Sequence, residues 1–113
     1  MKKATLGIIA ALAALAALPL YAGNTISTID RILLSDTSMI IYVYPKNGVT
    51  NPPACHGSNG DYYSFSATRP MAKEYLSALL AAQARGATVS LYGTGACDDQ
   101  SYSETLHYLR IDN

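Results

Sequence analysis

Two hydrophobic patterns divide the chain into a leader and a folded part. After Met1, Lys2 and Lys3, residues 4–18 carry no charge and are mostly alanine, leucine and isoleucine. From residue 23 onward, short apolar stretches alternate with polar ones, and one longer stretch has the spacing of a helix. The first pattern predicts a secretory signal peptide, and the second predicts a small mixed domain.

Five stretches have the alternation, or the β-branched and aromatic content, of strands. The strongest is Met39–Tyr44, with the sequence Met-Ile-Ile-Tyr-Val-Tyr, which predicts a central strand. The others, in chain order, are Ile26–Leu34, Tyr62–Ser66, Thr88–Tyr92 and Glu104–Ile111. Between the second and third of these five, Lys46–Asp61 is rich in glycine, asparagine and proline and is expected to be a long loop.

The stretch after Pro70 has the period of an amphipathic helix. Pro70 suits the first turn of a helix, and Gly86 suits its C-terminal stop. The positions at i, i+3, i+4 spacing are Met71, Tyr75, Leu76, Leu79, Leu80 and Gln83. We expect this stripe to be buried against a sheet.

The order of these elements predicts an α+β, mainly β, fold. Five strands with one helix between the third and fourth strands is the element order of the OB-fold. That fold is a five-stranded antiparallel barrel whose strand faces and loops bind sugars or nucleic acids. We therefore expect residues 23–113 to form a single OB-like domain, because about 90 residues leave no room for a second core.

Residues 1–22 are expected to be removed during export. Pro19 interrupts the apolar run before it reaches the roughly 20 residues that a membrane helix needs. Ala22 is a small residue of the kind that signal peptidases require. Cleavage there would leave a periplasmic or secreted protein that begins at Gly23 and has no membrane span. An uncleaved membrane anchor is the alternative, which the weak hydrophobicity of alanine disfavours.

The two cysteines both lie in the exported part. In an oxidising compartment a Cys55–Cys97 disulfide is the expected outcome. A metal site and a reactive thiol are the alternatives. His56 and His107 are the histidines that would join the cysteines as ligands, but the chain has no CxxC or HxxxH spacing. We therefore expect neither a metal nor a cofactor.

Charge narrows the classes of partner. The whole chain has 8 basic and 8 acidic residues, and two of the basic ones, Lys2 and Lys3, lie in the leader, which leaves a net charge of −2. Nucleic acids and anionic lipids are bound through clustered lysine and arginine. The exported part has no such cluster, so we expect no nucleic-acid partner.

No residue set of the kind that enzymes use stands out. The serines lack a G-x-S-x-G turn, and no DxDxDG loop follows Asp98 and Asp99. A small hydrolase that uses His56 or His107 is the least favoured alternative, because Cys55 is better used in the disulfide. We expect the protein not to be an enzyme.

Tyrosine is the enrichment that points to binding. Eight of the nine tyrosines follow the leader, against one phenylalanine and no tryptophan. Tyrosine presents a flat apolar face with a hydroxyl, which suits sugar rings and interfaces. We assign Tyr42, Tyr75 and Tyr92 to the core and its edge. The candidate ligand-binding residues at strand ends and loops are Tyr44, Tyr62, Tyr63 and Tyr102, with Lys46 and Arg69 as partners for a carboxylated sugar.

Four segments together resemble a known family. They are Cys-His-Gly at 55–57, Met-Ala-Lys-Glu-Tyr-Leu-Ser-Ala-Leu-Leu-Ala-Ala-Gln-Ala-Arg-Gly at 71–86, Gly-Thr-Gly-Ala-Cys at 93–97 and Glu-Thr-Leu-His-Tyr-Leu-Arg-Ile at 104–111. With their surroundings, over 26–111, they resemble the small exported proteins related to the subtilase cytotoxin B subunit.

This resemblance implies an OB-fold homopentamer that binds sialylated glycans on host cells and carries a separate toxic subunit. It also implies that the sugar-binding serine and tyrosines of those subunits correspond to Ser35 and to Tyr62 or Tyr63. Many relatives of the toxin subunits look like stand-alone exported proteins, so the resemblance by itself does not imply a toxin.

The leading hypothesis is therefore an exported, non-enzymatic binding protein similar to toxin B subunits, which recognises a host glycan or a protein. The competing hypothesis is a periplasmic structural or inhibitory domain that binds a protein partner through a sheet edge and has no sugar site.

Overall fold

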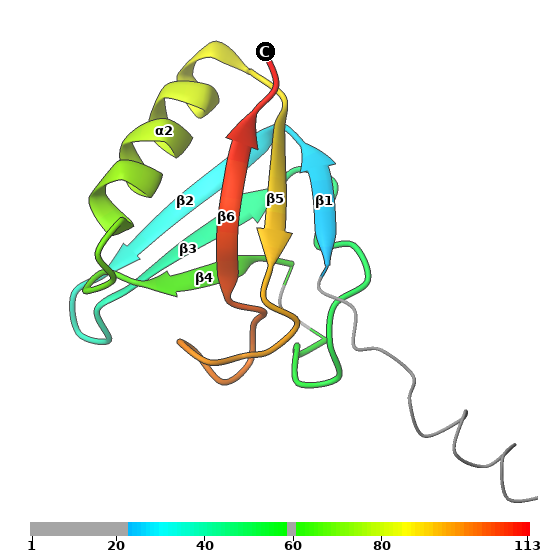
Figure 1. Ribbon diagram of the computed structural model, residues 1–113, viewed down its shortest axis with the longest axis vertical. Coiled ribbons are helices and arrows are strands. Elements are labelled where there is room, and N and C mark those ends of the chain that lie inside the picture. The colour runs from blue at the N-terminus through cyan, green and yellow to red at the C-terminus, as the bar shows by residue number, and fades with distance from the viewer. Residues whose placement is uncertain (1–22, 59–60) are drawn as a thin grey trace, which may run out of the picture.

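The computed structural model describes residues 23–58 and 61–113, and the predicted signal peptide, residues 1–22, lies outside the described residues. In the described part, six strands and one helix follow one another (Figure 1). They are β1 (Asn24–Ser27), β2 (Ile29–Ser35), β3 (Ile40–Pro45), β4 (Tyr63–Ser66), α2 (Ala72–Arg85), β5 (Val89–Gly93) and β6 (Leu106–Ile111). The mainly β class is confirmed.

The strands form two antiparallel three-stranded sheets, ordered β1-β5-β6 and β2-β3-β4. In Figure 1, β5 and β6 pass in front of the second sheet, and α2 lies along one side of the pair. An isolated parallel bridge between Ser64 and Thr105 joins β4 to the segment before β6. The core lies between the sheets and α2, and its fully buried members are Val43, Tyr63, Phe65, Leu79, Ala82, Val89, Leu91 and Leu106.

The predicted five-stranded OB-fold-like barrel is wrong. The described strands form two separate sheets and no closed barrel. The single strand expected over Ile26–Leu34 is two strands that separate at Thr28 and enter different sheets. The helix consequently lies between the fourth and fifth strands, not between the third and fourth.

The break at Thr28 has a physical cause that hydrophobicity does not reveal. In β1 the polar side chains of Thr25 and Ser27 point inward, while Ile26 is 58% exposed. The inward hydroxyls are satisfied by long-range partners, since Thr25 Oγ1 accepts the backbone N–H of Thr50 and Ser27 Oγ accepts that of Asn47. These hydrogen bonds join residues far apart in the sequence, so they exist only in the folded chain and leave no local pattern.

The helix is confirmed, with a narrower buried side than its sequence predicts. It ends at Gly86, whose φ of 64° lies in the left-handed region that glycine adopts without strain. Leu79 is fully buried, but Met71 and Leu80 of the expected stripe are 52% and 46% exposed. The stripe is therefore only partly covered by the sheets.

The Cys55–Cys97 disulfide is confirmed, with 6.1 Å between the two Cα atoms. It joins the long loop before β4 to the loop after β5, and 42 positions separate the cysteines in the sequence. In the loop-closure account, a cross-link of this span stabilises the fold by about 4 kcal/mol.

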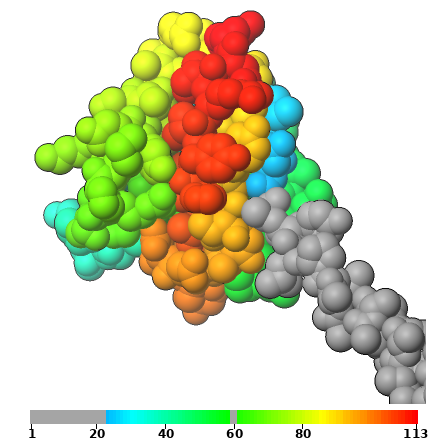
Figure 2. Space-filling view, in the orientation of Figure 1, coloured from blue at the N-terminus to red at the C-terminus, as the bar shows by residue number. Residues whose placement is uncertain are grey.

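Figure 2 shows β5 and β6 at the centre of one face of the molecule, with α2 on one side and β1 on the other. On this sheet, Tyr92 and Tyr108 stack with their ring centroids 4.3 Å apart. Across residues 23–58 and 61–113, no helix has the length and apolar character needed to cross a membrane.

Candidate functional site

Three tyrosines gather on one face of the β2-β3-β4 sheet. Tyr42 and Tyr44 are two residues apart on β3, so they point to the same face, opposite to the buried Val43. Tyr62, just before β4, has its ring centroid 5.2 Å from that of Tyr42 and 5.0 Å from that of Tyr44. All three are half-buried, so each keeps part of its surface accessible.

Arg31 adds a positive charge to this aromatic group. It lies opposite Tyr44 in the pairing of β2 with β3, and its guanidinium carbon is 4.1 Å from the centre of the Tyr44 ring. This separation is within the range of a cation–π interaction. Arg31 is exposed. We call Arg31, Tyr42, Tyr44 and Tyr62 the tyrosine platform.

The loop that follows Cys97 borders the tyrosine platform. The side-chain amide of Gln100 donates to the hydroxyl of Tyr62 over 3.4 Å, and its Oε1 accepts the backbone N–H of Tyr102 over 2.8 Å. His56, in the loop before β4, has its ring centroid 6.4 Å from that of Tyr62. Because Cys55 and Cys97 tie these two loops together, the disulfide supports the border of the platform.

Of the predicted ligand-binding residues, the structure brings Tyr44 and Tyr62 together. Tyr102 lies on the bordering loop and is 65% exposed. Lys46 is exposed just beyond the end of β3. Ser35 lies at the opposite end of β2, where it pairs with Ile40 and its hydroxyl accepts a bond from Ser38.

Tyr63 occupies the core. It is fully buried, and its hydroxyl forms a 2.8 Å hydrogen bond with Thr25 Oγ1. Burial raises the pKa of Tyr63 to about 12, although the Thr25 hydrogen bond acts in the opposite direction. Its side chain joins the two sheets and presents no surface to a ligand.

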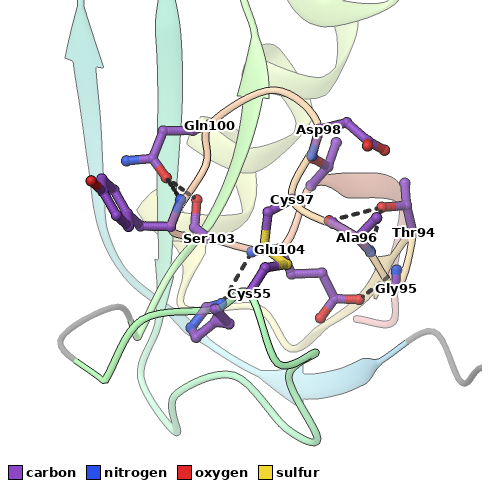
Figure 3. Close-up of a disulfide and its surroundings, with 12 residues drawn as sticks. Cys55, Thr94, Gly95, Ala96, Cys97, Asp98, Gln100, Ser103 and Glu104 are labelled. Atoms are coloured by element: carbon purple, nitrogen blue, oxygen red, sulfur yellow. Dashed lines mark hydrogen bonds between the residues drawn. A yellow bond between two sulfur atoms is a disulfide. The ribbon is translucent and has the colours of Figure 1, made fainter.

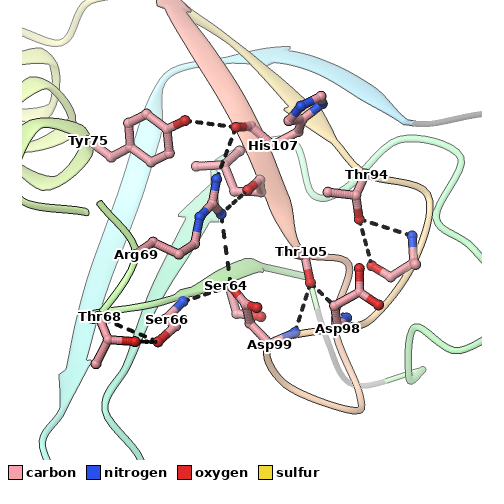
Figure 4. Close-up of polar contacts among 12 residues, drawn as sticks. Ser64, Ser66, Thr68, Arg69, Tyr75, Thr94, Asp98, Asp99, Thr105 and His107 are labelled. Atoms are coloured by element: carbon pink, nitrogen blue, oxygen red, sulfur yellow. Dashed lines mark hydrogen bonds and ion pairs between the residues drawn. The ribbon is translucent and has the colours of Figure 1, made fainter. Parts of the chain in front are cut away.

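Arg69 is engaged by the backbone of β6 (Figure 4). Its guanidinium donates to the carbonyl oxygens of Leu106 and His107 and lies 3.9 Å from the carboxylate of Asp99. Tyr75 donates its hydroxyl to the same His107 carbonyl over 2.8 Å. Arg69 and Tyr75 thus connect the helix region to the edge of β6.

A buried carboxylate forms a second cluster, which the sequence did not predict. Glu104 is fully buried beside the disulfide, and Figure 3 shows its side chain reaching toward Gly95. Its Oε2 accepts the backbone N–H groups of Gly95 and Gly23, over 2.9 and 3.1 Å. Its Oε1 has no hydrogen-bond partner among the described residues.

The electrostatics of this cluster extend to His56. The backbone N–H of Glu104 donates to His56 Nδ1 over 3.0 Å. Burial lowers the pKa of His56, against the opposing effect of the Glu104 and Asp61 carboxylates. Within residues 23–58 and 61–113, no three His, Cys, Asp or Glu side chains are grouped to hold a metal ion.

An open apolar pocket of about 250 Å³ lies at the far end of the β2-β3-β4 sheet from the tyrosine platform. It is lined by Leu34, Ser35, Asp36, Met39, Ile40, Ile41, Ala67 and Leu76. Ser35 therefore belongs to this pocket and not to the tyrosine platform.

Two members of the tyrosine platform were not among the predicted ligand-binding residues. Tyr42 was assigned to the core and its edge, although its two-residue spacing from Tyr44 is a signal that both side chains share one face. No sequence signal pairs Arg31 with Tyr44, because that pairing depends on the register of β2 against β3.

Comparisons of this chain with protein-family models, with curated proteins and with solved structures find no match. The resemblance to toxin B subunits thus rests on the sequence segments alone.

Proposed function

We propose that the protein is an exported, non-enzymatic binding protein that recognises a glycan on the tyrosine platform. The observation that carries this proposal is the meeting of Tyr42, Tyr44 and Tyr62 with the exposed Arg31 on one face of the β2-β3-β4 sheet. Accessible aromatic faces beside a positive charge match a sugar ring that bears a carboxylate.

The chemistry of the four side chains supports a carboxylated sugar. The tyrosine rings offer apolar faces to the C–H groups of a sugar, and their hydroxyls offer hydrogen bonds to its hydroxyl groups. A guanidinium matches the two oxygens of a carboxylate. Arg31 would supply it, since Arg69 is held by backbone carbonyls. The resemblance to toxin B subunits implies the same ligand class, sialylated glycans.

A glycan array with the exported, oxidised protein tests this proposal. We expect binding to carboxylated glycans, and we expect Tyr44→Ala and Arg31→Gln each to weaken it about tenfold or more, a loss of about 1.4 kcal/mol. Tyr108→Ala is the matched control, because Tyr108 is an exposed tyrosine on the other sheet. An array without binding, or equal losses in all three variants, would contradict the proposal.

The apolar pocket favours the second candidate, a periplasmic structural or inhibitory domain that binds a protein. Leu34 and Met39, which line the pocket, are 59% and 48% exposed, and exposed apolar clusters are common at protein interfaces. A protein ligand whose binding is lost in Leu34→Asp but kept in Tyr44→Ala would support this candidate over the glycan-binding protein proposed above.

A further inference from the structure

Gly23, the residue just before β1, lies close to several oxygen atoms. The N–H of Gly23 donates to Glu104 Oε2 over 3.1 Å. A side chain at position 23 would begin 2.9 Å from Glu104 Oε1, 2.8 Å from the carbonyl oxygen of Thr50 and 3.3 Å from that of Asn51. A Cβ would be too close to these oxygens, so residue 23 must be glycine for the chain to pass beside the Glu104 carboxylate.

No cation in the described part neutralises Glu104. The ion pairs among the described residues are Arg69 with Asp99 and Arg110 with Asp112, and neither includes Glu104. Glu104 is fully buried, and its Oε1 has no hydrogen-bond partner among residues 23–58 and 61–113. A buried charge without a partner is strongly unfavourable, so a positive group beside this carboxylate would stabilise the fold.

We propose that Glu104 is the receptor for the α-ammonium group that signal-peptide removal creates at Gly23. The peptidase hydrolyses the Ala22–Gly23 bond, so the hydroxyl of water goes to the Ala22 carbonyl carbon and one hydrogen goes to the Gly23 nitrogen. The new carboxylic acid of Ala22 releases a proton, and the new amine takes one up. The leader departs as a carboxylate, and Gly23 becomes an ammonium group.

The number of hydrogens on the Gly23 nitrogen explains why Glu104 Oε1 has no hydrogen-bond partner among the described residues. A Gly23 amide carries a single N–H, and that hydrogen is used by Oε2. An ammonium group carries three hydrogens and a positive charge, so it satisfies Oε1 as well and neutralises the buried carboxylate. The N–H of Gly93 donates to the carbonyl oxygen of Gly23 over 2.9 Å, which holds the new N-terminus in place.

Processing would in this way stabilise the native fold. The precursor retains a buried charge without its partner, while the mature protein has an ion pair of low exposure. This inference rests on the predicted signal peptide and is independent of the tyrosine platform. Glycan binding is therefore not among its tests.

The first test identifies the N-terminus and compares two forms of the oxidised protein. We export the full chain, determine the intact mass and N-terminal sequence of the product, and expect Gly23 as its first residue. A second form, released from a fusion by a specific protease, begins at Ala22 and so has an amide nitrogen at Gly23. We expect its Tm to be lower by about 10 °C.

A double-mutant cycle separates an ion pair from a general effect of the extra residue. In Glu104→Gln the carboxylate charge is absent, so the forms that begin at Gly23 and Ala22 should have the same Tm. The NMR titration of the α-amino group provides a measurement that needs no variant. We expect its pKa to lie above the ordinary value of about 7.7–8.0.

The sign of the pH dependence follows from that shift. A raised pKa in the folded state means that the stability advantage of the Gly23 form is complete below about pH 8 and is lost as the pH rises through the folded pKa. The other titratable groups that face Glu104 titrate in different pH ranges. The pKa of His56 is lowered from 6.5, and the pKa of Tyr63 is raised to about 12.

Two results would overturn the proposal. One is a mature protein whose first residue is not Gly23. The other is an equal Tm for the two wild-type forms together with an ordinary pKa of the α-amino group. Both results are obtained on wild-type protein, so they decide the question even if Glu104→Gln does not fold.

Discussion

The imidazole of His56 illustrates how a backbone contact fixes the protonation of a side chain. Nδ1 accepts the backbone N–H of Glu104, so this nitrogen carries no proton in the folded state. Burial lowers the pKa of His56, and the neighbouring carboxylates of Glu104 and Asp61 only oppose this effect. The fold therefore favours the neutral imidazole.

We expect acidification to destabilise the protein through His56. The folded pKa is below the unfolded value of about 6.5, so the unfolded chain binds the proton first. The contribution of His56 is complete above the unfolded pKa and is lost as the pH falls toward the folded pKa. Urea unfolding at pH values between about 7.5 and 5 measures it.

Two variants isolate this effect. His56→Asn keeps an acceptor for the Glu104 N–H but does not titrate, and it should have a weaker pH dependence of unfolding than the wild type. His107→Asn is the control, because the His107 side chain is exposed. Unchanged pH dependence in His56→Asn, or equal weakening in both variants, would contradict the assignment.

Neighbouring residues can have opposite roles, and here the sequence was a partial guide. Tyr62 and Tyr63 were both predicted to contact a ligand, but Tyr62 joins the tyrosine platform and Tyr63 lies in the core. Successive side chains of an extended chain point to opposite sides, so one of the pair had to turn inward. Which one does so depends on the pairing of Tyr63 with Val43.

Among the secondary-structure elements, the helix was predicted best. Its limits follow from local rules, with Pro70 before its first turn and Gly86 in the left-handed conformation after its last. Its burial was predicted less well, because a helical stripe indicates which side is apolar and not how far the sheets extend over it.

We expect the two adjacent leucines of α2 to differ in their importance for stability. Leu79 is fully buried, and Leu79→Ala should lower the free energy of unfolding by about 2–5 kcal/mol. Leu80 is 46% exposed, and Leu80→Ala should change it by about 0.5 kcal/mol or less. Urea unfolding measures both, and losses of equal size would show that the burial of α2 differs from the structure.

The strands show the limit of local patterns. Ile26–Leu34 has the apolar content of one strand, yet β1 and β2 enter different sheets. No glycine or proline lies near Thr28 to mark the break, and the residues around it are all compatible with an extended chain. The break is enforced by long-range contacts such as the hydrogen bond from the Lys46 N–H to the Thr28 carbonyl.

In the molecule as a whole, a few long-range links hold the sheets, the helix and the loops together. The disulfide connects the loops that border the tyrosine platform, and Arg69 connects the start of the helix to the edge of β6. The two sheets meet through Tyr63 and the bridge between Ser64 and Thr105. The tyrosine platform is thus supported from beneath by the core.

Light scattering of the oxidised protein without its predicted leader tests the homopentamer that the resemblance to toxin B subunits implies. The resemblance to toxin B subunits implies a ring that carries a separate toxic subunit, and we expect a solution mass of about five times the monomer. A monomer would contradict the delivery of a toxic subunit. It would leave the glycan proposal intact, because Arg31 and the three tyrosines of the platform all come from one chain.

Local order along the chain was enough to predict the helix, four of the strands to within a few residues, the long loop and the disulfide. These follow from residue spacing, turn chemistry and the presence of two cysteines. The assignment of strands to sheets, the meeting of Arg31 with Tyr44, and the burial of Glu104 against Gly23 were decided by the tertiary structure. The last of these contacts joins residues 81 positions apart, and spacing along a chain contains no information about such a distance until the sheets have packed.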